Sequence, residues 1–382
     1  MEKVYTDSLA LHREHGGKLE VASKVPLENR ADLSLAYTPG VAQVSIEISK
    51  DPAKAYEYTL KKNTVAVISD GSAILGLGNL GAKAAIPVME GKAILFKRLA
   101  GIDAFPICLD TQDTEEIIKA VKQIAPVFGA INLEDISAPR CFEIERRLQA
   151  ELDIPVMHDD QHGTAVVVLA GLINAIKLRG LSKATAKIIF NGAGAAGTAI
   201  AQLLITYGFK NIILADSQGA VYIGRPDLNE DKKQLAEQTN PTGVHGALAE
   251  IIQGADIFIG VSKAGLLTPE MVRLMAPHPI IFAMANPVPE IMPELAQQAG
   301  AFIVATGRSD FPNQVNNALG FPGIFRGALD NHLRQFTTAH FIGAAEALAA
   351  SVGTPTIDRI LPSPLDPVVV AAVAGAFAPK EA

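Results

Sequence analysis

The chain has 382 residues, 49% of them hydrophobic and 19% charged, with a formal net charge of -7 at pH 7. Such a length predicts two α/β domains, and the composition is that of a globular rather than a disordered protein. The negative charge gives no electrostatic reason to bind nucleic acid or an anionic membrane, so neither partner is expected. Two cysteines are too few for a disulfide framework and favour a reducing, cytoplasmic location.

The amino-terminal sequence is polar and lacks the apolar core of a secretion signal. The longest apolar stretches, 165–176 and 368–378, are shorter than the ~20 residues of a membrane span, so no anchor is expected. The first part of the chain predicts helices with a break at Pro39 and Gly40, which impose a turn. That turn presents Tyr37, whose residue type alone favours a packing role.

The first half continues with predicted strands at 64–69, 103–109 and 127–133 and helices at 114–124 and 139–151. These elements alternate along the chain. Alternation of this kind predicts a parallel sheet covered by helices.

A glycine-rich segment follows the first of these strands. Gly76, Gly78 and Gly81 have the spacing of a dinucleotide-binding loop, which by itself is a weak signal. The next segment contains Pro87 and a further glycine, so a regular phosphate-binding helix is not expected. Lys92 comes just after. Apolar neighbours could lower its pKa toward that of a base, and a solvated surface lysine is the simpler alternative.

Two acidic pairs follow predicted strands. Glu134 and Asp135 come after the strand at 127–133, and Asp159 and Asp160 come after a short strand at 154–157. Parallel strands place such ends side by side. Clustered carboxylates repel unless a cation neutralises them, and oxygen-only ligands favour Mg²⁺ or Mn²⁺. The sequence therefore predicts a metal site at this edge, followed by an apolar helix at 165–179.

His158 and His162 flank the second acidic pair at the spacing of a zinc-protease motif. That motif requires one continuous helix. The extended run before Asp159 places His158 ahead of the helix, so the two rings should not share a face. A zinc hydrolase is therefore not expected.

The second half carries a dinucleotide fingerprint in order: a strand at 186–190, a glycine loop, a helix to Tyr207, a strand at 211–215 and Asp216. In such a loop the first glycine permits a tight turn, the second lets the backbone approach a pyrophosphate, and the third allows close helix packing. An acid about twenty residues further on binds the ribose hydroxyls. The predicted coenzyme-binding residues are Gly192, Ala193, Gly194, Ala195, Ala196, Gly197 and Asp216.

Strands at 257–261, 280–285 and 301–305, with helices at 246–253 and 269–275, extend this doubly wound pattern. No basic residue directly follows Asp216, which favours NAD, although Arg225 could still reach the 2′-phosphate of NADP. Asn286 ends one strand, where its amide could hold a ribose or a carboxylate or simply initiate a turn before Pro287. Asp366 and Pro367 predict the cap and first position of the last helix.

The chain resembles the small-subunit bacterial malic enzymes over nearly its whole length, in six motifs that occur in the same order. They are Tyr37-Thr-Pro-Gly-Val-Ala42, Gly76-Leu-Gly-Asn-Leu-Gly81, Pro87-Val-Met-Glu-Gly-Lys92, Asn132-Leu-Glu-Asp135, His158-Asp-Asp-Gln-His-Gly-Thr164 and Asn286-Pro287. The resemblance implies an amino-terminal catalytic domain at 1–160 and a Rossmann domain at 161–382. The segment from about 318 onward would partly pack back on the first domain. It also implies NAD(P), a divalent metal and a homodimer.

Carried over by position, the resemblance makes Tyr37 the general acid, Lys92 the general base and Asp159 the partner of Lys92. The implied metal ligands are Glu134, Asp135 and Asp160. Asn286 would contact coenzyme and malate, with one of Asn316 or Asn317 also contacting malate; Asn317 is the predicted one. Larger relatives carry a carboxylate-binding arginine where this chain has Ser72 and Ala73, so that group is left open.

The implied reaction is oxidative decarboxylation of (S)-malate to pyruvate and CO₂ with reduction of NAD(P)⁺. An oxaloacetate decarboxylase would need the same metal and tyrosine without net redox chemistry. A regulatory nucleotide-binding module is a third hypothesis, and it would not need the second acidic pair.

Overall fold

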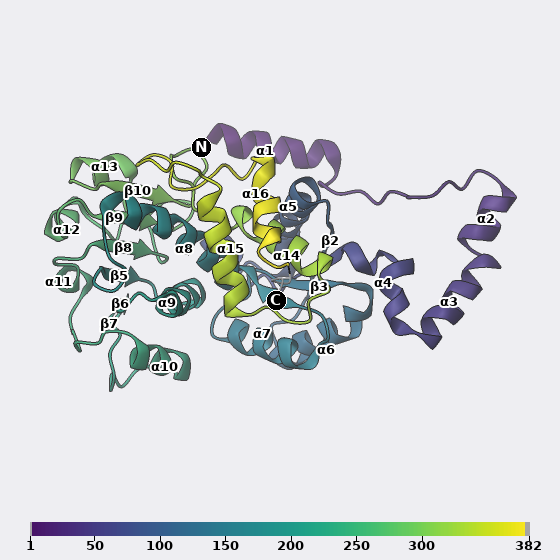
Figure 1. Cartoon of the computed structure of the whole chain (residues 1–382), viewed down its shortest axis with the longest axis horizontal. Coiled ribbons are helices and arrows are strands. Elements are labelled where there is room, and N and C mark those ends of the chain that lie inside the picture. Colours follow the sequence, from purple (N-terminus) through teal and green to yellow (C-terminus); the bar gives the residue numbers. More distant parts are fainter. Residues whose placement is uncertain (1, 379–382) are drawn as a thin grey trace.

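The computed structural model describes residues 2–378 and contains two mainly parallel sheets, one from each half of the chain (Figure 1). The first sheet has four parallel strands in the order β2-β1-β3-β4. They are β1 (Thr64–Ser69), β2 (Asp103–Cys108), β3 (Ala130–Leu133) and β4 (Val156–His158). Because the strands run the same way, their carboxyl ends share one edge.

Helices cover both faces of this sheet, as the apolar side chains on both sides of β1 require. Val65 and Val67 pack against α5 (Ala82–Ala100), whereas Ala66 and Ile68 pack against the helices of the opposite face. Those helices are α6 (Thr114–Ile124) and α7 (Arg140–Glu151).

The second sheet has six strands in the order β10-β9-β8-β5-β6-β7. They are β5 (Lys187–Asn191), β6 (Asn211–Asp216), β7 (Gly219–Ala220), β8 (Ile257–Gly260), β9 (Ile280–Ala283) and β10 (Ile303–Thr306). All pairs are parallel except β6 with β7. The chain order reverses between β5 and β8, which is where α/β sheets of this kind bind ligands.

This sheet is also covered on both faces, so the doubly wound α/β prediction is confirmed. One face packs on α9 (Ala195–Tyr207), beside which lies α10 (Glu230–Gln238). The other packs on α11 (Leu248–Ile251), α12 (Pro269–Leu274) and α13 (Pro293–Gln298).

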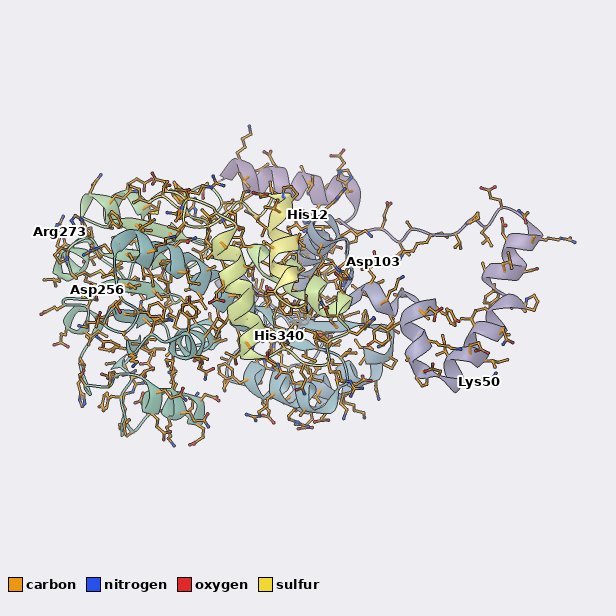
Figure 2. The ribbon with its side chains drawn as sticks, in the orientation of Figure 1. His12, Lys50, Asp103, Asp256, Arg273 and His340 are labelled. Carbon is orange, nitrogen blue, oxygen red and sulfur yellow. The ribbon has the colours of Figure 1, made fainter. Side chains whose placement is uncertain are left out.

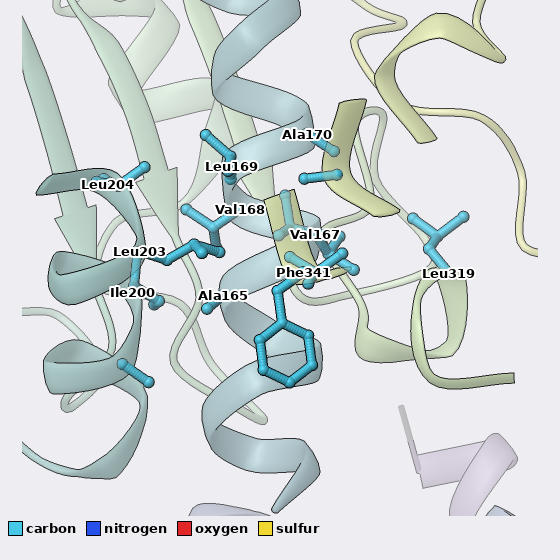
Figure 3. Close-up of a cluster of buried hydrophobic side chains, with 14 of the residues drawn as sticks. Ala165, Val167, Val168, Leu169, Ala170, Ile200, Leu203, Leu204, Leu319 and Phe341 are labelled. Carbon is cyan, nitrogen blue, oxygen red and sulfur yellow. The ribbon is translucent and has the colours of Figure 1, made fainter. Parts of the chain in front are cut away.

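Helix α8 (Asp159–Arg179) connects the two sheets and is packed between α9 and α15 (Thr338–Ala350). Figure 3 shows Val168 and Leu169 beside Leu203 of α9, with Phe341 of α15 on the other side. Its length and hydropathy alone would allow α8 to cross a membrane, but 67% of its apolar window is buried inside the fold. We therefore interpret α8 as the core helix of a globular protein.

The carboxyl-terminal helices lie against the first half of the chain. After a short 3₁₀ turn (Asn317–Leu319), α14 (Phe321–Asp330) and α16 (Pro367–Gly375) both contact α5. The rings of Phe96 in α5 and Phe321 in α14 meet edge to face at 4.6 Å between centroids. The Asp366 side chain caps α16 by accepting from the Val368 amide, as predicted.

The amino-terminal segment has two parts. Helix α1 (Glu2–His15) lies along the body of the molecule, and the segment that follows it extends away from the body as an arm (Figure 1). The arm carries α2 (Arg30–Ala36) and α3 (Gly40–Lys50), in which no residue is buried. Helix α4 (Ala55–Tyr58) then leads back to β1.

Three local expectations were wrong. Helix α5 is continuous from Ala82 to Ala100 despite Pro87. Pro87 is exposed, and the helix is held by the buried side chains of Ala85, Met89 and Phe96 on its other face. Helix α8 begins at Asp159, so the acidic pair forms its first turn, where the helix dipole favours negative charge. The third strand begins later than expected because residues 125–127, with Pro126, form a 3₁₀ turn.

Candidate active site

A cavity of about 630 Å³ lies where the carboxyl edges of the two sheets face each other. Its walls come from the loop after β1, one face of α5, the ends of β3, β8 and β9, and the start of α9. The polar and charged side chains that line it are His12, Lys18, Lys92, Glu134, Asp135, Asp160, Thr164, Ser262, Asn286, Asn316 and Asn317.

Three carboxylates meet at one end of this cavity. Glu134 and Asp135 follow β3, and Asp160 lies in the first turn of α8, directly after the neighbouring strand β4. One oxygen from each lies within 4.8 Å of the other two. Asp160 Oδ2 accepts a hydrogen bond of 2.9 Å from the Asp135 backbone amide, which holds the Asp160 carboxylate beside Asp135.

The crowding shifts the ionisation of these acids. Burial, together with the charge of Asp160, raises the pKa of Asp135 to about 7. Burial also raises the pKa of Glu134 well above its usual value, although Lys92 opposes the shift. Within the described residues, Asp135 Oδ2 is buried and has no hydrogen-bond partner. A cluster of this kind fits a divalent cation, which would supply the missing positive charge and a partner for that oxygen.

Lys92 lies beside the acids in the structure. Its Nζ is 2.6 Å from Asp159 Oδ2 and 2.9 Å from Glu134 Oε1, and it lies 4.3 Å from the centre of the Phe321 ring. Burial would lower the pKa of Lys92, but the two carboxylates outweigh burial and raise it. The expectation of a lowered pKa was therefore wrong for the metal-free protein, because apolar burial comes with two counter-charges.

A second layer of polar residues holds the acid cluster, and sequence reasoning missed its central member, Glu145. This buried carboxylate of α7 accepts hydrogen bonds from the His158 amide at 2.8 Å and from Gln161 Nε2 at 3.0 Å. His158 Nε2 lies 3.3 Å from Asp160 Oδ2, whereas His162 Nε2 lies 3.1 Å from Glu145. The two histidines thus contact different acids, which agrees with the rejection of a zinc motif. Nothing in the sequence distinguishes Glu145 from other helical acids.

The glycine loop after β5 has the geometry that its spacing predicts. Gly192 has φ of +125°, and a Cβ there would lie 2.8 Å from the Val261 carbonyl oxygen. A Cβ on Gly197 would overlap the Gly192 carbonyl, so α9 packs closely on the loop. At Gly194, the cap of α9, nothing lies within 4 Å of a Cβ. This exposed helix start is suited to a pyrophosphate.

Asp216 ends β6, as predicted, and two cations hold it. Its oxygens accept hydrogen bonds from Arg225 at 2.9 and 2.6 Å and from Lys232 Nζ at 2.6 Å. Burial would raise the pKa of Asp216, but these bonds outweigh it and keep the pKa well below the usual range. Arg225 therefore reaches the position predicted for the adenosine ribose. The absence of a basic residue directly after Asp216 is thus weaker evidence for NAD over NADP than the sequence suggests.

The predicted asparagines also line the cavity. Asn286 lies after β9, next to Gly307, where a Cβ would approach its amide to 3.0 Å. Asn316 Oδ1 accepts a hydrogen bond from the Ala318 amide at 2.9 Å. The side chain of Asn317 forms no hydrogen bond to any residue in the described range 2–378. Asn317 is therefore the better placed of the two to bind a ligand.

Ser72 does not face the cavity. Its hydroxyl donates to Asp70 at 2.5 Å and accepts from Arg140 at 3.0 Å, and Arg140 also pairs with Asp70 at 2.9 Å. These bonds fix the loop after β1. Ala73 does line the cavity, so this loop brings no cation to it.

Tyr37, the predicted general acid, does not lie at the cavity of its own chain. It follows α2 on the arm and is 67% exposed. Its neighbours along the arm are exposed too.

The two sheets, the open glycine loop and the acid cluster define a dinucleotide-binding α/β enzyme with a candidate metal centre. Residues 16–149 match the malic enzyme N-terminal domain family, and residues 161–377 match the malic enzyme NAD binding domain family. The chain therefore belongs to the malic enzymes, which oxidatively decarboxylate malate with NAD(P)⁺.

Individual relatives agree with this family. The chain is 56% identical to a bifunctional malic/malolactic enzyme of Bacillus subtilis, over 97% of this chain and 92% of the relative. It is also 56% identical to an NAD-dependent malic enzyme of Geobacillus stearothermophilus, over 93% of this chain and 74% of the relative. The crystal structure of an NAD-dependent malic enzyme from Thermotoga maritima superposes with a TM-score of 0.94 at 51% identity, covering 97% and 98% of the two chains.

Proposed function

We propose that this protein converts (S)-malate to pyruvate and CO₂ while reducing NAD⁺ or NADP⁺, with Mg²⁺ or Mn²⁺ held by Glu134, Asp135 and Asp160. The observation that carries the proposal is that the acid cluster lines the same cavity as Ala196, which lies in the glycine loop at the start of α9. A dication at the acids and a nicotinamide at the β5–β8 edge would therefore meet the same small molecule.

A metal bound there supplies Lewis acidity, which eases loss of the hydroxyl proton and later of CO₂. Lys92 is the acceptor of the hydroxyl proton, and Asp159, 2.6 Å away, positions its ammonium group. A nearby dication would add positive charge and counter the two acids that raise the pKa of Lys92. NAD(P)⁺ bound at the glycine loop would supply the acceptor for hydride from C2. Tyr37 then donates a proton to C3 as pyruvate forms.

The coenzyme would lie along the glycine loop from Gly192 to Gly197, with its adenosine ribose at Asp216. Asn286 lies between the two halves of the site, since Gly76 of the first glycine segment approaches its backbone oxygen. It is therefore placed to contact both nicotinamide and malate. Asn317 would bind malate from the other wall of the cavity.

The experiment is a spectrophotometric assay of malate with NAD⁺ and with NADP⁺, with and without Mn²⁺. We expect metal-dependent formation of reduced nicotinamide together with pyruvate. Failure of malate to reduce either coenzyme would contradict the proposal. Decarboxylation of oxaloacetate in that case would point to the lyase alternative.

The Bacillus subtilis relative is named a bifunctional malic/malolactic enzyme, so a second outcome can be tested in the same mixtures. Conversion of malate to lactate and CO₂ would leave the nicotinamide absorbance unchanged. Measuring lactate beside pyruvate therefore separates the two reactions.

We further propose a cytoplasmic homodimer in which the arm places Tyr37 in the cavity of the partner subunit. Support comes from the exposure of Tyr37 and of large apolar side chains on the same arm, since exposed apolar patches mark interfaces. These side chains are Leu33, Leu35, Val41 and Ile46. Two cysteines without disulfides suit the cytoplasm.

Subunit mixing tests this arrangement. Tyr37→Phe and Lys92→Ala should each be inactive alone. If Tyr37 acts in the partner's cavity, each mixed dimer keeps one intact site, and roughly a quarter of native activity returns. If Tyr37 serves its own chain, unfolding and refolding the two variants together restores none.

A further inference from the structure

The cavity has a cation that the reaction described above does not use. Three lining side chains can carry positive charge: Lys92, Lys18 and His12. Lys92 is already paired with two carboxylates. Lys18 differs, because no carboxylate among the described residues lies within the 4.0 Å ion-pair distance of its Nζ.

Contacts with α5 place Lys18 at the turn of that helix before Lys92. Lys18 Nζ donates to the Pro87 carbonyl at 2.6 Å, and the Lys18 backbone amide donates to Glu90 Oε2 at 3.1 Å. A Cβ on Gly91 would lie 3.7 Å from Lys18 Nζ, so the ammonium lies over the residue that precedes Lys92. The Pro87 carbonyl uses one of the three N–H donors of the Lys18 ammonium, and the other two remain for a ligand.

His12 adds a second polar group at the same wall. Its Nδ1 bonds the Ser8 carbonyl at 2.7 Å, whereas its buried Nε2 has no partner among the described residues. Figure 2 shows His12 on the side of α1 that faces the body of the molecule. An unsatisfied buried nitrogen in a cavity wall indicates a ligand or water that completes it.

Malate is a dianion, and its C1 carboxylate, beside the reacting C2, must lie toward Lys92 and the acid cluster. The C4 carboxylate therefore needs its own cation. Ala73 supplies none, and Arg140 is bound to Asp70. We propose that Lys18 binds the C4 carboxylate of malate, with His12 Nε2 as an additional polar contact. This inference rests on the proposed function and assigns the carboxylate-binding group that the loop after β1 lacks.

Binding by Lys18 has a kinetic signature. The C4 carboxylate loses its charge as CO₂ leaves, so an ammonium there stabilises bound malate more than the transition state of decarboxylation. Removing Lys18 should therefore raise KM for malate while lowering kcat much less. Pyruvate lacks C4, so product inhibition by pyruvate should not change.

The test compares Lys18→Met, Lys18→Arg and the control Lys3→Met, which removes an exposed charge from helix α1, the helix that precedes Lys18. We expect Lys18→Met to raise KM and the calorimetric Kd for malate roughly 10- to 100-fold, as for loss of one charged hydrogen bond. Lys18→Arg should recover most of this, and Lys3→Met should match the native protein.

An unchanged Kd for malate in folded Lys18→Met would overturn the inference. So would equal weakening of malate and pyruvate, which would indicate a collapsed cavity rather than a lost C4 contact. If Lys18→Met does not fold, Lys18→Arg and His12→Asn test the inference in its place. For His12→Asn we expect weaker binding of malate with unchanged inhibition by pyruvate. A native protein inactive on malate would refute the proposed function instead.

Discussion

The two strand edges that face the cavity hold their ligands in opposite ways. At the first sheet, charged side chains crowd together, with Glu134, Asp135 and Asp160 within 4.8 Å. At the second sheet, backbone amides are exposed because side chains are missing, as at Gly194. The first edge should therefore be sensitive to loss of charge and tolerant of small changes in shape. The second should be sensitive to a single added methyl group and insensitive to charge.

The largest effect expected concerns the first edge. Asp160→Asn keeps the size of the side chain but removes a metal-binding charge, so malate-dependent NAD⁺ reduction should fall at least about 1,000-fold, as expected for loss of metal catalysis. Mn²⁺ affinity should fall with it, measured by calorimetry. Asp110→Asn is the matched control, because Asp110 follows β2 of the same sheet and is exposed outside the cavity. Full activity in Asp160→Asn would show that charge is not what this edge supplies.

The second edge is tested by adding one methyl group at two glycines. Gly197→Ala would overlap the Gly192 carbonyl and should destabilise the protein by about 2 to 4 kcal/mol, measured by denaturant unfolding. Gly194→Ala meets open space, so stability should be unchanged. Its KM for coenzyme should rise about tenfold, because the methyl group lies where the pyrophosphate approaches. If both variants lost stability and coenzyme affinity equally, Gly197 would not serve packing alone and Gly194 would not serve coenzyme binding alone.

Local patterns predicted most of the backbone. Thr64–Ser69 and Thr114–Ile124 have the predicted bounds, since each has a clear period and clear ends. The acid cluster was foreseeable because parallel strands bring successive carboxyl ends together, whatever the details of the helix that follows. The glycine loop was foreseeable because each glycine has its own steric reason.

The sequence could not predict the features that depend on tertiary contacts. Pro87 suggested a break, but packing of Met89 and Phe96 on the sheet keeps α5 helical. Lys92 has a raised rather than lowered pKa because two acids distant in sequence pair with it. Lys18 belongs to a segment with no motif, and only the fold places it beside the cavity.

The metal-free state offers a weaker test of charge crowding. Asp135 has a pKa raised by burial and by Asp160 to about 7, so the folded protein retains a proton that the unfolded chain releases near pH 4. Stability of the metal-free protein should therefore decline as pH rises through that range, and Mn²⁺ should compensate. We expect the Tm difference between Mn²⁺ and chelator to widen by roughly 2 to 5 °C between pH 5.5 and 7.5. Asp135→Asn should abolish the widening, and a constant difference in the native protein would argue against repulsion.

The smallest effect expected is on coenzyme choice, at the one place where the second edge does use charge. Arg225 and Lys232 occupy the Asp216 carboxylate, so Asp216→Ser would free two cations where the 2′-phosphate of NADP lies. The ratio of kcat/KM for NADP⁺ to that for NAD⁺ should rise roughly three- to tenfold, equivalent to about 1 kcal/mol.

Asp227→Ser is the control for Asp216→Ser, since Asp227 also pairs with Arg225, at 2.8 Å, but lies outside the strand end and is 47% exposed in its side chain. A rise confined to Asp216→Ser would mean that the carboxylate itself excludes the phosphate. A rise shared by both variants would mean instead that freeing Arg225 is sufficient. The second edge would then discriminate coenzymes by the same neutralisation of charge that governs the first.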